Sequence, residues 1–364
     1  MSDDPGRPVL ALNAGSSSLK FGFFMVGASG SRVLLSGAEE TLAKPQAAVA
    51  RIAQRMEAQG LPAPIAVGHR IDHGGPQCRR HTLIDAAVMQ QLEAATAFAP
   101  LHVPPALALV RAAQARFSGI AQVACLDTAF HAGMPDVART LPLPRELRAL
   151  GIERYGFHGL SGESIVRQLS SDLPPRVVIA HLGHGASVTA VAHGASVDTS
   201  MGLTPTGGVI MSTRCGDIDP GVLAYVVREH GYDATQLEAL IDQRSGLLGI
   251  SGLSGDMREL HAAAASTSAS GADARLAIAM FCASVRKQIA AMAVVLGGVD
   301  LLVFTGGIGE NDASTRAFIC EGLEVLGIHK AMTRVSPAQE EELIAWRTWQ
   351  LTQPPNRTTI LELP

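Results

Sequence analysis

Two short apolar runs joined by small polar residues form the first clear pattern in the chain. Residues 9–24 read VLALNAGSSSLKFGFF, in which residues 13–18 separate two strand-like runs and Lys20 lies just inside the second. The pattern predicts a β-hairpin whose tip offers small side chains and backbone N–H groups to a phosphate chain. Because a strand follows Gly15, and because GxxxxGK[ST] does not occur in the sequence, this hairpin is not a Walker loop.

The same pattern returns in the second half of the chain. Residues 177–188 read VVIAHLGHGASV and predict a second hairpin, in which Gly185 corresponds to Gly15 and Ser187 to Ser17. Two such hairpins predict a duplicated α/β domain with a nucleotide bound between the copies. A third glycine segment, GGIGEN at 306–311, follows a buried run and precedes a helical pattern, so it predicts a strand–turn–helix suited to a nucleoside.

Helical spacing and shorter apolar runs organise the rest of the chain. A long apolar helix is expected to end at Gly297 and Gly298. The pattern changes near residues 148–151, which predicts a boundary between domains 1–149 and 150–364. Helices are predicted over 44–59, 86–99, 105–117, 225–230, 235–243 and 274–296, and strands over 65–67 and 123–126.

Composition limits the classes of function. The 364 residues are 47% hydrophobic and 17% charged, enough to fill two domain cores, and the formal net charge of -4 offers no footprint for nucleic acid or an anionic membrane. The five cysteines show no CxxC spacing, so we expect free thiols in a reducing cytoplasm. The polar N-terminus is unlike a signal peptide, and we expect no membrane span and a cytoplasmic protein.

A series of segments from Asn13 to Asn311 carries a specific resemblance. In order they read NAGSSSLKF, GHRIDHGG, APLHVPP, DTAFH, YGFHG, HLGHGAS, MGLTP, TRCGDIDPG, SGLLGISGLSGDMREL and FTGGIGEN. Together they resemble the acetate/propionate kinase family. The resemblance implies a duplicated actin-like, sugar-kinase-like (ribonuclease H-like) α/β fold with an active-site cleft between two domains. It also implies a homodimer and ATP-dependent phosphorylation of acetate to acetyl phosphate.

The resemblance places four residues in the chemistry. Arg70 and Arg214 match the family's two active-site arginines, whose planar guanidinium groups suit both a carboxylate and a phosphoryl oxygen. His158 matches a donor to the transferred phosphoryl group, and Asp127 matches the catalytic aspartate. A carboxylate substrate is already ionised at neutral pH and needs no general base. We therefore interpret Asp127 as organising the water shell of a metal and the arginines.

The resemblance also implies contacts to nucleotide and metal. Magnesium, with manganese as an alternative, is expected to bridge the phosphates of ATP or ADP, and Asn13 is the expected metal contact. The His69/His73 pair has the spacing of a zinc site on a helix, but the segment follows a strand and ends in glycines, so we do not expect helical geometry there. The expected nucleotide-binding residues are Ser16, Lys20, His181, Leu182, Gly183, His184, Gly185, Asp256, Met257, Arg258, Gly307, Ile308, Gly309, Glu310 and Asn311.

Two single residues depart from the family pattern. His184 stands where the family usually has asparagine, which puts a titratable ring near the phosphates. Asp72 stands where the family usually has an aliphatic residue lining the acyl pocket, whose other expected members are Leu101, Phe157 and Pro205. A carboxylate there would repel an anionic substrate, unless it turns outward to pair with one of the arginines at 79 and 80.

The tail from about residue 330 is the third departure. The family continues to a segment that supplies a magnesium-site glutamate. Here either residues 356–364 represent the strand before that segment and the chain stops short of it, or Glu340-Glu341-Glu342 is a displaced version of it. An acetate kinase is the function that we expect, with a kinase for propionate or another short-chain carboxylate as one alternative. A weakly active or inactive nucleotide-binding homologue is the other.

Overall fold

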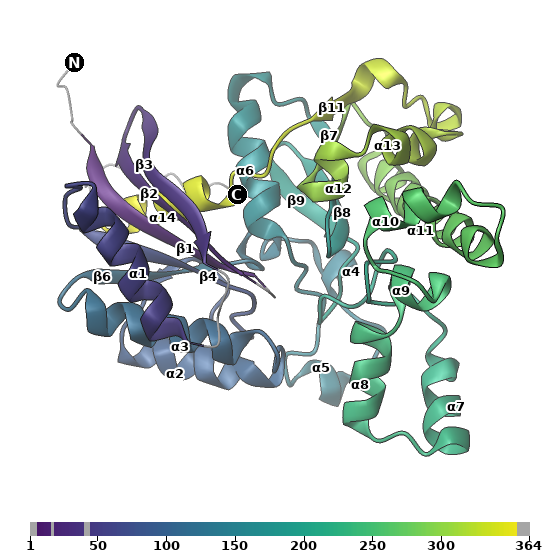
Figure 1. The fold of residues 1–364 in the computed structure, drawn as a ribbon, viewed down its shortest axis with the longest axis horizontal. Coiled ribbons are helices and arrows are strands. Elements are labelled where there is room, and N and C mark those ends of the chain that lie inside the picture. Colours follow the sequence, from purple (N-terminus) through teal and green to yellow (C-terminus); the bar gives the residue numbers. More distant parts are fainter. Residues whose placement is uncertain (1–5, 16–17, 40–43, 355–364) are drawn as a thin grey trace. The chain divides into compact units, whose positions relative to one another are not determined.

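The computed structural model describes residues 6–15, 18–39 and 44–354, and its contacts divide the chain into two units (Figure 1). Unit 1 comprises residues 1–129 and 339–364, and unit 2 comprises residues 130–338. This division differs from the domains 1–149 and 150–364 that we expected. Helix α4 (Asp136–Arg139) packs on β9 (Ala195–Thr199), which assigns the segment after residue 129 to unit 2, and helix α14 (Glu340–Leu351) returns to unit 1.

Unit 1 is built on a six-stranded mixed sheet in the order β3-β2-β1-β4-β6-β5. The predicted first hairpin is confirmed, because β1 and β2 pair antiparallel with Asn13 opposite Lys20. Strand β4 then pairs parallel with both β1 and β6. The strands are β1 (Arg7–Ala14), β2 (Leu19–Gly27), β3 (Gly30–Glu39), β4 (Ala66–Ile71), β5 (Thr82–Leu83) and β6 (Ala121–Leu126).

Helices cover both faces of this sheet, which explains why β1 reads as a continuous apolar run. Leu10 and Leu12 share a core with Ile52 of α1 and Leu109 of α3. On the opposite face of the sheet, a Cβ at Gly68 of β4 would meet Ile344 and Thr348 of α14. The remaining helices of unit 1 are α1 (Pro45–Ala58), α2 (Ala86–Ala94) and α3 (Val103–Arg116), close to the ranges predicted from the sequence.

Unit 2 contains a five-stranded sheet in the order β11-β10-β7-β8-β9. Strands β7, β8 and β9 pair antiparallel, which confirms the second hairpin, and β10 and β11 continue in parallel beyond β7. Strands β7, β8, β9, β10 and β11 therefore occupy the same positions in their sheet as β1, β2, β3, β4 and β6 occupy in the sheet of unit 1. This correspondence is expected for a duplicated fold. The further strands are β7 (Arg176–Leu182), β8 (Ala186–Ala192), β10 (Leu301–Thr305) and β11 (Thr333–Val335).

The correspondence that we drew between Gly15 and Gly185 is wrong, and Ser17, which we matched with Ser187, lies outside the described residues. The first strand ends at Ala14 and the second begins at Leu19, whereas the equivalent strands of unit 2 end at Leu182 and begin at Ala186. The loops thus differ in length. Gly15 opens the first loop and Gly185 closes the second, so the two glycines are not equivalent.

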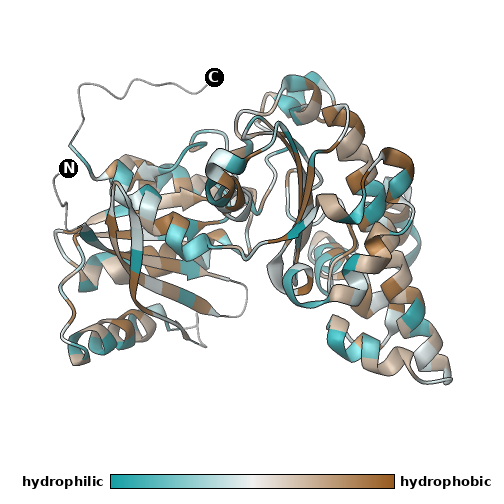
Figure 2. Ribbon diagram, turned by 90° about the horizontal axis from the view of Figure 1, so that it is seen from above, coloured by the Kyte–Doolittle hydropathy of each residue, from teal (hydrophilic) through white to brown (hydrophobic). Residues whose placement is uncertain are grey.

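Alternating side chains of β7 face two separate cores, and brown, hydrophobic positions follow the strands in Figure 2. Val178 and Ala180 pack with the long helix α11, and Val177 and Ile179 pack with α6. Besides α4, the α-helices of unit 2 are α5 (Arg145–Arg148), α6 (Gly159–Leu169), α7 (Pro220–His230), α8 (Ala234–Gln243), α9 (Gly246–Ser251), α10 (Met257–Ala264), α11 (Ala269–Leu296), α12 (Gly306–Asn311) and α13 (Ala313–Cys320).

Helix α11 begins five residues before its predicted start because Ser268 caps it, accepting a hydrogen bond from Gly271 N, and it ends at Gly297 with φ of 67°. It is also the one described helix long and apolar enough to cross a membrane by length and composition. Phe281, Val285 and Ile289 of α11 are fully buried in the core of unit 2, which is the environment of a core helix. No disulfide joins the five cysteines, all of which the structure describes.

Candidate active site

Three parallel strands bring Asn13, Arg70 and Asp127 together in unit 1. Asn13 lies near the end of β1, Arg70 near the end of β4, and Asp127 directly after β6, where its backbone N–H donates to Ile71 O at 2.9 Å. Alternation along each strand turns all three side chains toward the face that α14 covers. Since the carboxyl ends of parallel strands meet at one edge of a sheet, this edge is where a site is expected.

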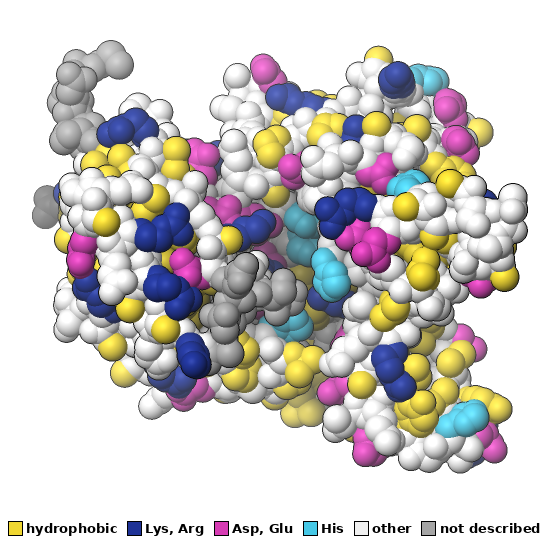
Figure 3. All heavy atoms as spheres, in the orientation of Figure 1, with side chains coloured by type: hydrophobic (Ala, Val, Ile, Leu, Met, Phe, Trp, Pro, Cys, Tyr) yellow, Lys and Arg dark blue, Asp and Glu magenta, His cyan; other side chains and the backbone are white. Residues whose placement is uncertain are grey.

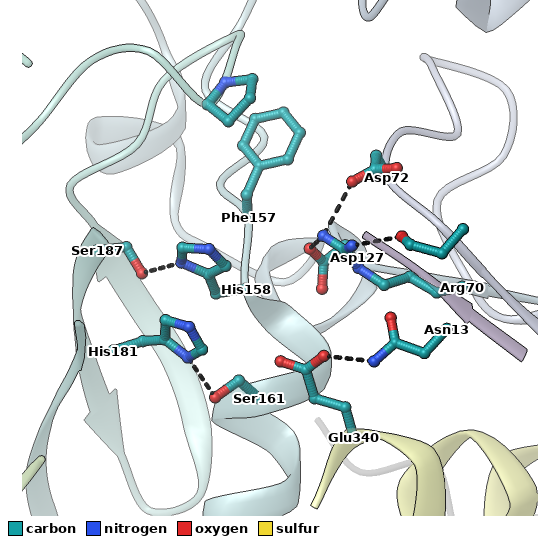
Figure 4. A network of polar contacts seen from close by, with 12 residues as sticks. Asn13, Arg70, Asp72, Asp127, Phe157, His158, Ser161, His181, Ser187 and Glu340 are labelled. Carbon is teal, nitrogen blue, oxygen red and sulfur yellow. Dashed lines mark hydrogen bonds and ion pairs between the residues drawn. The ribbon is translucent and has the colours of Figure 1, made fainter. Parts of the chain in front are cut away.

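Arg70 is held by three oxygen acceptors (Figure 4). Its Nη1 donates to Ala14 O at 2.9 Å, and its Nη2 lies 2.8 Å from Asp127 Oδ2 and 2.9 Å from Asp72 Oδ1. Burial opposes the positive charge, but Asp127, Asp72 and Glu340 outweigh it and raise the pKa of Arg70. Asp72 thus pairs with Arg70 itself, a residue that neither reading of the sequence had considered as its partner.

The tail supplies two further carboxylates to the same edge of the sheet. Asn13 Nδ2 donates to Glu340 Oε2 at 2.9 Å and to Glu341 Oε1 at 2.8 Å. Burial raises the pKa of Glu340, and Asp127 and Glu341 add to that effect, whereas Arg70 and the Asn13 hydrogen bond oppose it. These contacts put Glu340 and Glu341 beside Asn13, where the reading of the tail as displaced glutamates requires carboxylates. Residues 356–364, on which the other reading rests, lie outside the described part of the chain.

The residues at this edge fit a magnesium ion held largely through water and phosphate. Within the described residues, no three His, Cys, Asp or Glu side chains converge closely enough to hold a metal directly. Asn13, Asp127 and Glu340 nevertheless offer the hard oxygen donors that Mg²⁺ prefers. Because carboxylates outnumber the single guanidinium here, a cation would relieve their mutual repulsion.

The zinc alternative fails on geometry. His69 lies in a strand, and its Nε2 is 2.8 Å from Gln122 Oε1. His73 Nδ1 accepts a hydrogen bond from Gly75 N, and its ring stacks on Phe98. Burial lowers the pKa of His69 to about 4, and the Gln122 bond only partly offsets it, so this imidazole is neutral. The two histidines are structural residues.

In unit 2, His158 and His181 form a stacked pair. Their ring centroids are 4.1 Å apart, and each Nδ1 is fixed by a serine, Ser187 at 3.0 Å for His158 and Ser161 at 2.8 Å for His181 (Figure 4). His158 also has a left-handed backbone with φ of 58°, an uncommon conformation for a residue with a side chain. Ser187, the stacked ring of His181 and a strained backbone thus position His158, the imidazole predicted to contact the phosphoryl group.

The glycine loop after β7 lies against these imidazoles. A Cβ at Gly185 would be 3.2 Å from His158 Nε2 and 3.3 Å from Arg214 Nη1, and one at Gly183 would be 3.7 Å from both His181 Nε2 and Gly307 N. The loop therefore brings backbone together with two histidines, an arginine and the start of α12. Such a combination of cations and backbone N–H groups suits a polyphosphate.

Arg214 is anchored beside this loop. Its Nη1 donates to Pro205 O at 3.0 Å and approaches Met211 Sδ at 3.6 Å. Burial lowers the pKa of His184, and Arg214 lowers it further. Both effects favour the neutral imidazole at the position where the family usually has asparagine.

The segment at 306–311 is helix α12 and not the turn that we predicted. Gly306 has φ of 79°, and a Cβ there would be 2.7 Å from Leu182 O, so only glycine fits this close approach of β10 to β7. Glu310 Oε1 then accepts from Gly306 N at 3.0 Å and Ala338 N at 3.2 Å. These bonds let the chain enter a helical turn directly after the strand.

The other expected nucleotide residues divide into exposed and buried groups. Asp256 caps α10 through Arg258 N, and Arg258, whose side chain is 91% exposed, returns an ion pair to it. Lys20 is exposed on the same sheet face as Asn13. Met257 and Leu182 are buried in the core, which leaves only their backbones for a ligand. Ser16 lies outside the described residues.

Among the expected acyl-pocket residues, Leu101 of unit 1 is 54% exposed and Phe157 of unit 2 is buried. Sequence reasoning missed Ser161 and Ser187, which orient the histidines, and the Ala14 carbonyl, which orients Arg70. Ser187 is opposite His181 in the hairpin, and a pairing diagram of the two strands would have placed it on the histidine face. No pattern in the sequence indicated the other two.

Comparisons with known proteins show a matching family and several similar structures. The family model described as the acetokinase family matches residues 39–347. Acetate kinase 2 of Neisseria meningitidis serogroup B is 44% identical, with 88% of this chain and 87% of that protein covered. A propionate kinase from Francisella tularensis has a TM-score of 0.87 at 34% identity, covering 95% of this chain and 100% of that one. Porphyromonas gingivalis acetate kinase has a TM-score of 0.85 at 33% identity, covering 96% and 100%.

Proposed function

Because the chain belongs to the acetokinase family, we propose that it catalyses the reversible, ATP-dependent phosphorylation of acetate to acetyl phosphate. A carboxylate oxygen of acetate attacks the γ-phosphorus, the bond from that phosphorus to the bridging oxygen breaks, and ADP leaves with the electron pair. The total negative charge is the same before and after the transfer, so no proton is gained or lost. This is why Asp127 need not act as a base.

The observation that carries the proposal is Arg70, fixed at the carboxyl edge of the unit 1 sheet by Asp127 and by Ala14 O. In this proposal Arg70 binds the acceptor carboxylate, and Asn13, Asp127 and Glu340 orient the water shell of Mg²⁺. When bound, Mg²⁺ supplies charge neutralisation to the phosphate oxygens. Asp127 and Ala14 O hold the guanidinium in place before substrate arrives, so little reorganisation is needed.

Unit 2 supplies groups that suit the nucleotide. His158, His181 and Arg214 present donors near residues 183–185, and in the proposal they bind the transferred phosphoryl group and its neighbours. Residues 256–258 and 307–311 bind the nucleoside. The resemblance to the family further leads us to propose a homodimer in the cytoplasm.

A direct test is trapping of acyl phosphate with hydroxylamine, using purified protein, ATP, Mg²⁺ and acetate, propionate or butyrate in parallel. The proposal expects hydroxamate formation with acetate. Nucleotide binding is measured separately by calorimetry. Binding of ATP with no acyl phosphate from any acceptor would instead identify a nucleotide-binding homologue without turnover.

A further inference from the structure

Asp72 and Asp127 form ion pairs with the same nitrogen of Arg70, but the two carboxylates differ in their exposure to solvent. Asp127 and Asp72 both approach Arg70 Nη2, at 2.8 Å and 2.9 Å. The Asp127 side chain is 1% exposed, whereas those of Asp72 and Arg70 are 13% and 16% exposed. Of the two carboxylates paired with Arg70, Asp72 is therefore the one that solvent reaches. A small carboxylate that approaches Arg70 from solvent meets the Asp72 carboxylate there.

The charges around Arg70 make this encounter unfavourable for a plain alkyl carboxylate. The charged groups that act on Arg70 are Asp72, Asp127 and Glu340, all of them acidic. Glu340 accepts a hydrogen bond from Asn13, whereas Asp127 and Asp72 are both ion-pair partners of Arg70, and Asp72 is the more exposed of the two. An incoming carboxylate competes with Asp72 for that arginine, and an alkyl chain next to it offers Asp72 no donor in return.

The contact between Arg70 and Asp72 is the one that an incoming carboxylate would replace. A carboxylate that takes Arg70 Nη2 from Asp72 gains from the guanidinium and leaves Asp72 in need of a new partner. A hydroxyl on the carbon next to the acceptor carboxylate meets that need, because an O–H donates a charge-assisted hydrogen bond to a carboxylate.

We propose that Asp72 makes the acceptor site selective for short 2-hydroxy carboxylates over alkyl carboxylates of the same size. The inference rests on the proposed function, since it assigns the substrate preference of the same site. The transferred group and the leaving ADP are those of the acetate reaction, and the product is a 2-hydroxyacyl phosphate. Acetate, the smallest alkyl acceptor, remains a substrate, used less well than glycolate.

Glycolate and propionate provide a matched pair, because a hydroxyl in one replaces a methyl in the other. Initial rates of hydroxamate formation are measured for both acceptors with the full chain, saturating ATP and Mg²⁺, and the two kcat/KM values are compared as a ratio. For the wild-type protein we expect the ratio to favour glycolate. In Asp72→Val it should fall at least fivefold, through a lower KM for propionate and a higher KM for glycolate.

Two further variants serve as a second test of Asp72 and as a control. Asp72→Asn keeps the shape and removes the charge, so it should shift the ratio in the same direction if Asp72→Val does not fold. Glu93→Gln, at an exposed ion pair with Arg111, should leave the ratio unchanged. A wild-type protein that prefers propionate, or a ratio that changes less than fivefold in the folded Asp72 variants, overturns the assignment.

Failure of the proposed function is distinguishable from failure of this inference, because in the first case no acceptor yields an acyl phosphate. In that event saturation-transfer NMR of glycolate and propionate binding still decides the role of Asp72. A wild-type preference for glycolate that Asp72→Val abolishes supports it, and equal binding of the two acceptors by both proteins overturns it.

Discussion

Replacing Arg70 with alanine should damage stability and turnover by two separable routes. Arg70 is the ion-pair partner of Asp127, whose side chain is 1% exposed. Removal of one member of a buried pair leaves the other charge uncompensated, which typically costs about 3–5 kcal/mol. The Ala14 carbonyl also loses its donor, at a cost of about 1 kcal/mol.

The second route is loss of charge stabilisation during phosphoryl transfer. A preorganised donor aimed at developing charge is worth about 3–4 kcal/mol, or 10²–10³ in kcat. We therefore expect Arg70→Ala to retain ATP binding and to lose at least a hundredfold in turnover. Arg214→Ala should lose a similar factor, since Arg214 lies beside the phosphate loop of unit 2.

The double variant Arg70→Ala/Asp127→Asn separates the two routes. Neutralising Asp127 removes the uncompensated charge, so thermal stability should recover most of the loss, while turnover should stay low. Stability is followed by differential scanning fluorimetry, turnover by hydroxamate formation, and ATP binding by calorimetry. Arg116→Ala, which breaks an exposed pair with Glu57, is the control and should change stability by less than about 1 kcal/mol.

Two results would refute this reasoning. Turnover of Arg70→Ala within tenfold of wild type would remove the arginine from the chemistry. A double variant as unstable as the single one would show that the uncompensated Asp127 charge is not the cause of the destabilisation.

Three further perturbations test other parts of the structure. Glu340→Gln should raise the Mg²⁺ concentration needed for half-maximal activity, because it removes an oxygen donor beside Asn13. Gly306→Ala should weaken ATP binding and destabilise the protein by more than the roughly 1 kcal/mol expected from its positive φ alone, because its Cβ would meet backbone. His69 has its pKa lowered from 6.5 to about 4, so the unfolded chain binds more protons in that range. The free energy of unfolding is therefore undiminished by His69 above pH 6.5, and protonation of the unfolded chain lowers it by up to about 3 kcal/mol as the pH falls toward 4.

Each of these three predictions has a matched control variant. Glu342→Gln, in the same helical turn but bonded to Ser31, should leave the Mg²⁺ requirement unchanged. Gly322 has a similar φ of 82°, and a Cβ there would meet no atom within 4 Å. Gly322→Ala should therefore show only the destabilisation that comes from the positive φ. His69→Gln should unfold with a shallower dependence on pH between 6.5 and 4. Equal Mg²⁺ requirements, equal glycine costs or parallel pH profiles would contradict the respective interpretations.

The duplicated fold was predictable because hairpins and glycine loops have local signals. The apolar runs and their turns identify β1 with β2 and β7 with β8, and both pairs exist. The Arg70–Asp72 pair could also have been predicted from the sequence, because residues two apart in extended backbone lie on the same face. From the sequence we instead paired Asp72 with one of the arginines at 79 and 80.

Other features depend on contacts between distant segments. Glu340 reaches Asn13 across 327 positions, and nothing in the local pattern of its helix indicates which strands it covers. The serines that hold His158 and His181 come from a helix and a neighbouring strand, so their roles emerge only once the sheet is assembled. The turn predicted at 306–311 failed because a glycine-rich segment was assumed to avoid helix, whereas Glu310 bonds back to the strand end and starts one.

The return of α14 to unit 1 has a consequence for synthesis of the chain. Unit 2 is one continuous segment, so all of it has been made before residues 340–351 exist. Unit 1, although translated first, must wait for that helix to cover the face of β1 and β4 that carries Gly68 and Arg70. We therefore expect the nascent N-terminal sheet to stay incomplete, with one face uncovered, until residues 340–351 have left the ribosome. A ribosome stalled before residue 340 should carry a protease-resistant unit 2 beside a protease-sensitive unit 1.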